Sequence, residues 1–142
     1  MKTLSLLTVV LIAIAAPAQS LAAQDFKVIA NNDVAGSSIS KDVLAKVFYK
    51  QAAKLPDGTV AAPVYQSKSS ATRIAFDKAI LGKSVAGVET FWQQQIFSGK
   101  DVPPPSKGSD EDVINFVKST PGGIGYVSAG SAASGVKVIA VK

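Results

Sequence analysis

The residues of this chain that could do chemistry carry carboxylates and hydroxyls, because the sequence contains no Cys and no His. Disulfides, Cys/His zinc sites, thiol nucleophiles and imidazole bases are thereby excluded, and with them most hydrolase triads. The carboxylates occur one at a time among predicted turns and helix faces, and no pair has a spacing that places it across a substrate. They are Asp25, Asp33, Asp42, Asp57, Asp77, Glu89 and Asp101. The pattern favours a binding protein over an enzyme, and we expect no cofactor.

Acidic residues gather in one run, Asp110-Glu111-Asp112. Ser109, followed by Asp112 three positions later, forms a capping-box pattern ahead of an apolar helical segment, and acids favour the positive end of a helix dipole. Three successive helical residues point in different directions, so they do not converge on one ion without other ligands. We therefore interpret the run as a capping device and expect no metal site.

Hydroxyl side chains gather just ahead of a predicted helix. The segment from Val60 to Tyr65 has the composition of a strand, and Ser67, Ser69 and Ser70 follow it with hydroxyls that suit the start of a helix. Apolar residues at helical spacing predict the buried face of this helix, and a glycine ends it: Ile74, Phe76, Ala79, Ile80 and then Gly82.

Turn-forming residues divide the rest of the chain into further strands and helices. Strands are predicted over 26–30, 124–127 and 136–141, and helices after Ser40, across 88–96 and after Ser109, with Pro103-Pro104-Pro105 as an extended connector. Strands separated by helices predict an α/β fold with a small mixed or parallel sheet flanked by helices. In such folds, ligand sites are expected where loops leave the carboxyl ends of strands.

The amino-terminal residues 1–22 have the features of a secretory signal peptide. Lys2 precedes an apolar run from Leu4 through Ala16, and Ser20-Leu21-Ala22 offers the small side chains that a signal peptidase reads. The run has 13 residues, fewer than the roughly 20 of a membrane-crossing helix. We expect cleavage, export to the periplasm, no membrane insertion afterwards, and a single α/β domain over residues 23–142.

The charge balance is basic but dispersed. The chain has 15 Lys and Arg against 10 Asp and Glu, a formal net charge of +5, and Arg73 is its only arginine. Because the cations form no cluster or stripe that could follow a phosphate backbone, we expect no nucleic-acid partner. A mild positive field of this kind attracts small anions.

In their order and spacing, several motifs resemble the phosphate-binding proteins of ABC transporters. They are Leu44-Ala45-Lys46-Val47-Phe48, Asp57-Gly58, Pro63-Val64, Ser70-Ala71-Thr72 with Phe76, the stretch from Phe91-Trp92 to Phe97-Ser98-Gly99, and Thr120-Pro121-Gly122-Gly123-Ile124-Gly125-Tyr126-Val127. The resemblance implies a type 2 periplasmic binding fold. Members of that family have two lobes with the anion held in the cleft, whereas the 142 − 22 = 120 residues after the signal suffice for about one lobe. It therefore implies a short, single-lobe member.

The resemblance also implies where an anion would bind. In that family a strand ends in an Arg, and an Asp-Gly-Ser-Gly-Thr stretch opens a helix whose Ser hydroxyl, Gly amide and Thr hydroxyl hold phosphate. These three groups correspond to Ser70, Ala71 and Thr72 here. Free N–H groups, hydroxyls and the helix dipole attract an anion without a base or a metal.

The other half of the family pattern has changed. Gln66 stands in the position of the family's Arg, Lys68 in that of its Asp, and Ser69 in that of its first Gly. The loss of an Arg removes a bidentate, charge-assisted contact, for which Lys68 and Arg73 compensate in part. If the segment has only a structural role, its hydroxyls simply cap the helix and its cations are solvated.

Two functions follow from this pattern. In the first, the protein binds phosphate or a related small oxyanion and is linked to phosphate ABC transport, with an ABC permease or a second lobe from another chain as partner. Its expected ligand-binding residues are Ser67, Lys68, Ser69, Ser70, Ala71, Thr72 and Arg73. In the alternative, it is a ligand-free single-lobe interaction module that docks on a periplasmic partner protein, which the changes at Gln66 and Lys68 would explain.

Overall fold

The computed structural model describes residues 25–142 of the chain. The predicted signal peptide, residues 1–22, lies outside this range. Over the range that the structure covers, no helix is both long enough and apolar enough to cross a membrane.

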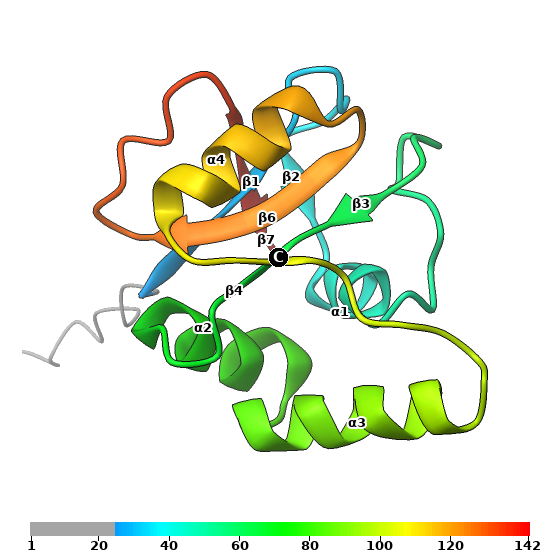
Figure 1. The fold of residues 1–142 in the computed structure, drawn as a ribbon. Helices are drawn as coiled ribbons and strands as arrows, with labels where there is room; N and C mark the ends of the chain where they lie inside the picture. Colours follow the sequence, from blue (N-terminus) through cyan, green and yellow to red (C-terminus); the bar gives the residue numbers. More distant parts are fainter. Residues whose placement is uncertain (1–24) are drawn as a thin grey trace, which may run out of the picture.

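A five-stranded mixed sheet forms the centre of the fold (Figure 1). Its strand order is β2 (Ser38–Ile39), β7 (Lys137–Val141), β1 (Phe26–Ala30), β6 (Gly123–Ser128) and β3 (Ala62–Pro63). The strand β1 runs antiparallel to both neighbours, whereas β2 pairs with β7 and β3 pairs with β6 in parallel. The predicted α/β class with a small mixed sheet is therefore confirmed.

The two outer strands of this sheet are very short. Both β2 and β3 contain two residues. The second residue of β3 is Pro63, which has no N–H group to donate to a further strand. A separate two-stranded parallel ladder follows, in which β4 (Tyr65–Gln66) pairs with β5 (Ser106–Lys107).

Helices cover both faces of the sheet. The helices α1 (Lys41–Phe48), α2 (Ala71–Phe76) and α3 (Val85–Phe97) pack with the large core cluster on one face, whereas α4 (Asp110–Ser119) covers the other (Figure 1). The helix α2 continues directly as a π-helix, η1 (Asp77–Leu81). Successive strand residues point to opposite faces, so Val28 of β1 joins the large cluster and Ile29 joins the α4 cluster.

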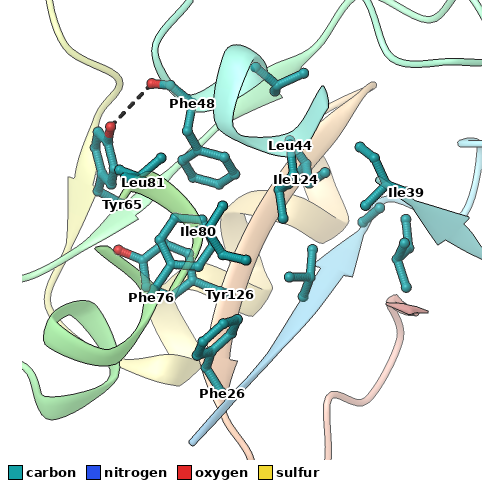
Figure 2. Packing of buried hydrophobic residues seen from close by; sticks show 14 of the residues in the cluster. Phe26, Ile39, Leu44, Phe48, Tyr65, Phe76, Ile80, Leu81, Ile124 and Tyr126 are labelled. Atoms are coloured by element: carbon teal, nitrogen blue, oxygen red, sulfur yellow. Dashed lines mark hydrogen bonds between the residues drawn. The ribbon is translucent and has the colours of Figure 1, made fainter. Parts of the chain in front are cut away.

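Aromatic rings fix α2 on the sheet (Figure 2). The rings of Phe76 and Tyr126 stack with centroids 3.8 Å apart and an interplanar angle of 5°. Phe48 packs against both rings, and the Tyr65 hydroxyl donates a hydrogen bond of 3.1 Å to the Phe48 carbonyl. Because these residues belong to β6, α1, α2 and β4, α2 is held against the sheet through its last residue, Phe76.

Most predicted element boundaries agree with the structure. The strand over 26–30 is β1, Ser40 and Ser109 cap α1 and α4, and Gly82 ends η1 with a φ of 68° in the left-handed region that suits glycine. The strand predicted from Val60 to Tyr65 is wrong as a single element, because the chain turns at Val64 from β3 into β4.

One predicted buried position is also wrong. Ile74 is 54% exposed. In α2 and η1 the inward positions are Arg73, Phe76, Asp77 and Ile80, a helical spacing that turns Ile74 toward solvent. The prediction counted only apolar residues as inward and therefore assigned the face incorrectly.

Candidate functional site

The loop between β4 and α2 contains the predicted anion-binding residues. Its first residue, Ser67, donates its N–H to the Lys107 carbonyl at 2.8 Å and accepts the N–H of Ser70 at 3.0 Å. Ser70 is the N-cap of α2, and its hydroxyl oxygen accepts the N–H of Arg73 at 3.1 Å. The helix therefore starts at the carboxyl end of β4, as the sequence predicts.

Several hydrogen-bond donors of this loop are free. Within residues 25–142, the N–H groups of Ala71 and Thr72 have no acceptor, as expected for the first positions of a helix. The hydroxyls of Ser67 and Ser69 form a hydrogen bond of 3.2 Å with each other at the exposed surface of the loop, which leaves one of the two free to donate. Amide and hydroxyl donors thus lie together at the positive end of a helix dipole, an arrangement that attracts anions.

The hydroxyl of Ser70 already donates one hydrogen bond and accepts another. It donates to Gln66 Oε1 at 2.9 Å while it accepts from the N–H of Arg73. Ser70 can therefore donate to an anion only if it leaves Gln66. Thr72 is 9% exposed, so its hydroxyl lies at the inner edge of the loop.

Gln66 joins three elements beneath the loop. Its side chain is buried, and Nε2 donates to Asp110 Oδ1 at 2.5 Å and to the Tyr126 carbonyl at 3.1 Å. Its carbonyl oxygen accepts the Ser106 hydroxyl at 2.8 Å. In the position where the resembled family has an Arg, this chain has a glutamine whose side-chain amide connects β4 to α4 and β6 and whose backbone carbonyl accepts from β5.

Asp110 has a larger role than the predicted capping. Besides Gln66, its carboxylate accepts the N–H and the hydroxyl of Ser128. Burial alone would raise the pKa of Asp110, but the hydrogen bonds from Ser128 and Gln66 outweigh it and lower the pKa below its ordinary value. Sequence reasoning missed this role because the partners lie 18 and 44 positions away. The capping itself is present, since the Ser109 hydroxyl accepts the N–H of Asp112.

Arg73 points into the protein beneath the loop. Its side chain is 2% exposed, and Nε donates to Asp77 Oδ2 at 2.7 Å. Its Nη1 donates to the Gln66 carbonyl at 3.0 Å, and its guanidinium lies 4.2 Å from the centroid of the Tyr65 ring. The spacing of Arg73 and Asp77, four positions apart on a helix, was a sequence signal that could have revealed this pair.

Glu89 is the residue that sequence reasoning left out of the site. It lies on α3, and its Oε2 is 2.6 Å from Lys68 Nζ while its Oε1 is 3.6 Å from Arg73 Nη2. Both cations of the segment are thus paired with acids. The purely structural interpretation agrees with the cap at Ser70 and with the 66% exposed side chain of Lys68, and it is wrong for Arg73, which is buried.

A groove of about 630 Å³ lies beside the loop, between α2 and the start of α3. Three of its lining residues are lysines, Lys68, Lys78 and Lys83, and they surround the apolar side chains of Ile74 and Val85. Three cations close together increase the positive field next to the loop. Among the described residues, no group of three or more acidic side chains could hold a metal ion.

No family model and no curated protein matches the sequence. The fold, however, matches solved structures. An ABC-type phosphate transport receptor from Vibrio cholerae shares 17% identity at a TM-score of 0.64, and the match covers 82% of this chain and 46% of the receptor. The fold is that of a single lobe of a phosphate-receptor-like periplasmic binding protein.

Two further structures agree. A phosphate ABC transporter type substrate-binding protein from Clostridium perfringens, with bound phosphate, has 15% identity and a TM-score of 0.62 over 82% of this chain and 44% of its own. PstS from Borrelia burgdorferi has 15% identity and a TM-score of 0.64 over 83% of this chain and 47% of its own. The predicted resemblance and the single-lobe fold are confirmed, and the chain spans less than half the length of these proteins.

Proposed function

We propose that this protein binds phosphate or a related small oxyanion at the loop before α2, as an exported solute-binding protein linked to phosphate ABC transport. The observation that carries the proposal is the set of free amide donors at Ala71 and Thr72 beside the exposed hydroxyls of Ser67 and Ser69. The fold supports it, because two of the three solved neighbours are described as phosphate transport proteins. The role is one of binding, without catalysis.

The residues of the segment contribute in different ways. Ala71 and Thr72 offer N–H groups, Ser67 and Ser69 offer hydroxyls, and Ser70 joins them when its hydroxyl leaves Gln66. The mobile cation is Lys68, whose side chain is 66% exposed. The buried charge of Arg73 contributes from beneath the loop.

Affinity in this arrangement is modest. The loop lies at the surface of one lobe, so water and salt screen each contact with the anion. A second lobe from another chain, or an ABC permease, would exclude water from the anion and strengthen binding. Residues 1–22 act as a cleavable signal that delivers the chain to the periplasm, where such partners operate.

Titration of the purified protein with phosphate, sulfate and arsenate by isothermal calorimetry tests the proposal. The double variant Ser70→Ala/Thr72→Val removes two hydroxyls of the segment and is expected to weaken binding, while the N–H groups of Ala71 and Thr72 remain. Loss of an N-cap costs about 1 kcal/mol of stability, so circular dichroism should show an intact fold.

The double variant Ser98→Ala/Ser119→Ala is the matched control. Both hydroxyls lie near helix ends and donate to carbonyls of their own helices, outside the loop. This control is expected to bind as the wild type does. No heat from the wild type at millimolar phosphate contradicts the proposal, and equal binding by the loop variant places the site elsewhere.

The alternative, an interaction module without a ligand, is favoured by one observation. The Ser70 hydroxyl donates a hydrogen bond to Gln66. Lys68 forms an ion pair with Glu89, and Arg73 forms one with Asp77. Three groups that would hold an anion therefore have partners inside the chain. This alternative predicts that all three anions give no heat. It also predicts that the protein forms a stable complex with a periplasmic protein, which co-purification under crosslinking would show.

A further inference from the structure

We propose that the carboxylate of Glu89 acts as a built-in anion at this loop and that an incoming oxyanion binds by displacing it. The inference rests on the proposed function of the same loop and adds how that site is regulated. Its basis is the position of Glu89 between two cations, with one oxygen 2.6 Å from Lys68 Nζ and the other 3.6 Å from Arg73 Nη2.

In the part of the chain that the structure describes, Arg73 has one buried hydrogen-bond donor without an acceptor. Its side chain is 2% exposed, and its Nε and Nη1 have hydrogen-bond acceptors, whereas Nη2 has none among residues 25–142. A buried donor without an acceptor is unfavourable, more so when it is charged. A carboxylate oxygen of Glu89 lies 3.6 Å from Nη2, beyond hydrogen-bond distance. Arg73 Nη2 therefore faces a position where a closer oxygen would be stabilised.

The Glu89 carboxylate is held only weakly at this position. Its side chain is 29% exposed, and its shorter contact is with Lys68, which is 66% exposed. An ion pair between such exposed side chains contributes up to about 1 kcal/mol. The carboxylate can therefore turn into solvent at a small cost and leave the position beside Arg73 open.

The local net charge depends on whether Glu89 is in place. With Glu89 in place, the charges of Lys68, Arg73, Asp77 and Glu89 sum to zero. When the carboxylate leaves, the group carries one positive charge, beside the free N–H groups at the start of α2 and the lysine-lined groove. An oxyanion carries its negative charge on several oxygens, so it can replace the carboxylate at Lys68 and also accept the loop N–H groups.

Glu89 therefore lowers the affinity of the loop for an oxyanion. When a competing group occupies a binding position most of the time, the apparent affinity falls in proportion to the fraction of open sites. Neutralising the carboxylate while keeping its size should therefore strengthen oxyanion binding.

The test compares inorganic phosphate titrations of the wild type and Glu89→Gln by calorimetry at low ionic strength. We expect Glu89→Gln to bind roughly threefold to tenfold more tightly. Glu89→Asp, which keeps the charge on a shorter side chain, is expected to fall between the two. Thermal unfolding of both variants shows whether they are folded.

The matched control is Glu111→Gln. This residue is exposed on α4, so its substitution changes the net charge by the same amount away from the loop. We expect a change in affinity of less than about twofold from this control, since exposed charges are screened.

The outcomes separate this inference from the proposed function. Binding by Glu89→Gln that is tighter than that of the wild type and of Glu111→Gln supports the inference. Equal binding by the wild type and Glu89→Gln, or an equal gain from Glu111→Gln, overturns the inference and leaves the proposed function standing. The absence of heat from every variant overturns both.

Discussion

Arg73 and Asp77 form an ion pair with little contact with water. Their side chains are 2% and 0% exposed, and Asp77 Oδ1 has no hydrogen-bond partner in the described part of the chain. Burial raises the pKa of Asp77 above its ordinary value, although the hydrogen bond and the charge of Arg73 oppose that rise. Removing two charges from water is unfavourable, so such a pair adds little net stability, yet loss of one partner leaves the other charge uncompensated.

Asp77→Leu should therefore be strongly destabilising. It leaves the Arg73 guanidinium buried without its carboxylate, which lowers the free energy of unfolding by about 3–5 kcal/mol. The double variant Arg73→Leu/Asp77→Leu is expected to lose less, because it leaves no buried charge behind. Urea denaturation of the three proteins measures both effects, and a double variant less stable than Asp77→Leu would contradict this account.

At the scale of elements, Asp110 connects helix α4 to the rest of the fold. One carboxylate at the start of α4 accepts hydrogen bonds from Gln66 next to the loop and from Ser128 at the end of β6. Directly beneath α4, Gly125 of β6 leaves room for the helix. A Cβ atom there would lie 2.9 Å from a methyl group of Val113. The helix is therefore held close to the sheet by packing along its length and by hydrogen bonds at its first residue.

The stability contributed by Asp110 should depend on pH. Its pKa is lowered in the folded protein, so the contribution is fully present above the ordinary Asp pKa of about 4 and is lost as the pH falls through the folded value. We expect Asp110→Asn to be less stable than the wild type at pH 6, with the difference shrinking below about pH 4. Urea denaturation across this range measures it, and a difference independent of pH would show that the carboxylate charge plays no part.

The local signals of helix ends account for what the sequence predicted well. The hydroxyls of Ser40 and Ser109 bond to N–H groups three positions ahead, and Gly82 adopts a left-handed conformation, so each is readable from a few neighbouring residues. The contacts of Gln66 with Asp110 and of Lys68 with Glu89 join separate elements. No periodicity encodes such contacts, which explains why the candidate site was predicted as a segment but without its partners.

At the scale of the whole molecule, the chain is one lobe that spans less than half of each solved neighbour. A site on one lobe is open to solvent on the side that a second lobe would cover. Ions of the buffer would therefore reach an anion bound at the proposed site and screen its contacts with Lys68 and the loop.

Phosphate affinity should accordingly depend on salt. The screening length falls from about 10 Å at 0.1 M ionic strength to about 3 Å at 1 M, so we expect roughly threefold weaker binding or more over this range. Calorimetry at several NaCl concentrations measures the effect, and light scattering on the same samples gives the oligomeric state. Binding that is insensitive to salt would instead indicate an anion enclosed between two chains.

The short outer strands β2 and β3 have a consequence for behaviour at high concentration. A long unpaired strand at the border of a sheet recruits strands from neighbouring molecules and so seeds aggregates. Here the outermost strand at each border has two residues, and Pro63 removes a donor from one of them. These two outer strands therefore offer a neighbouring molecule little backbone with which to pair.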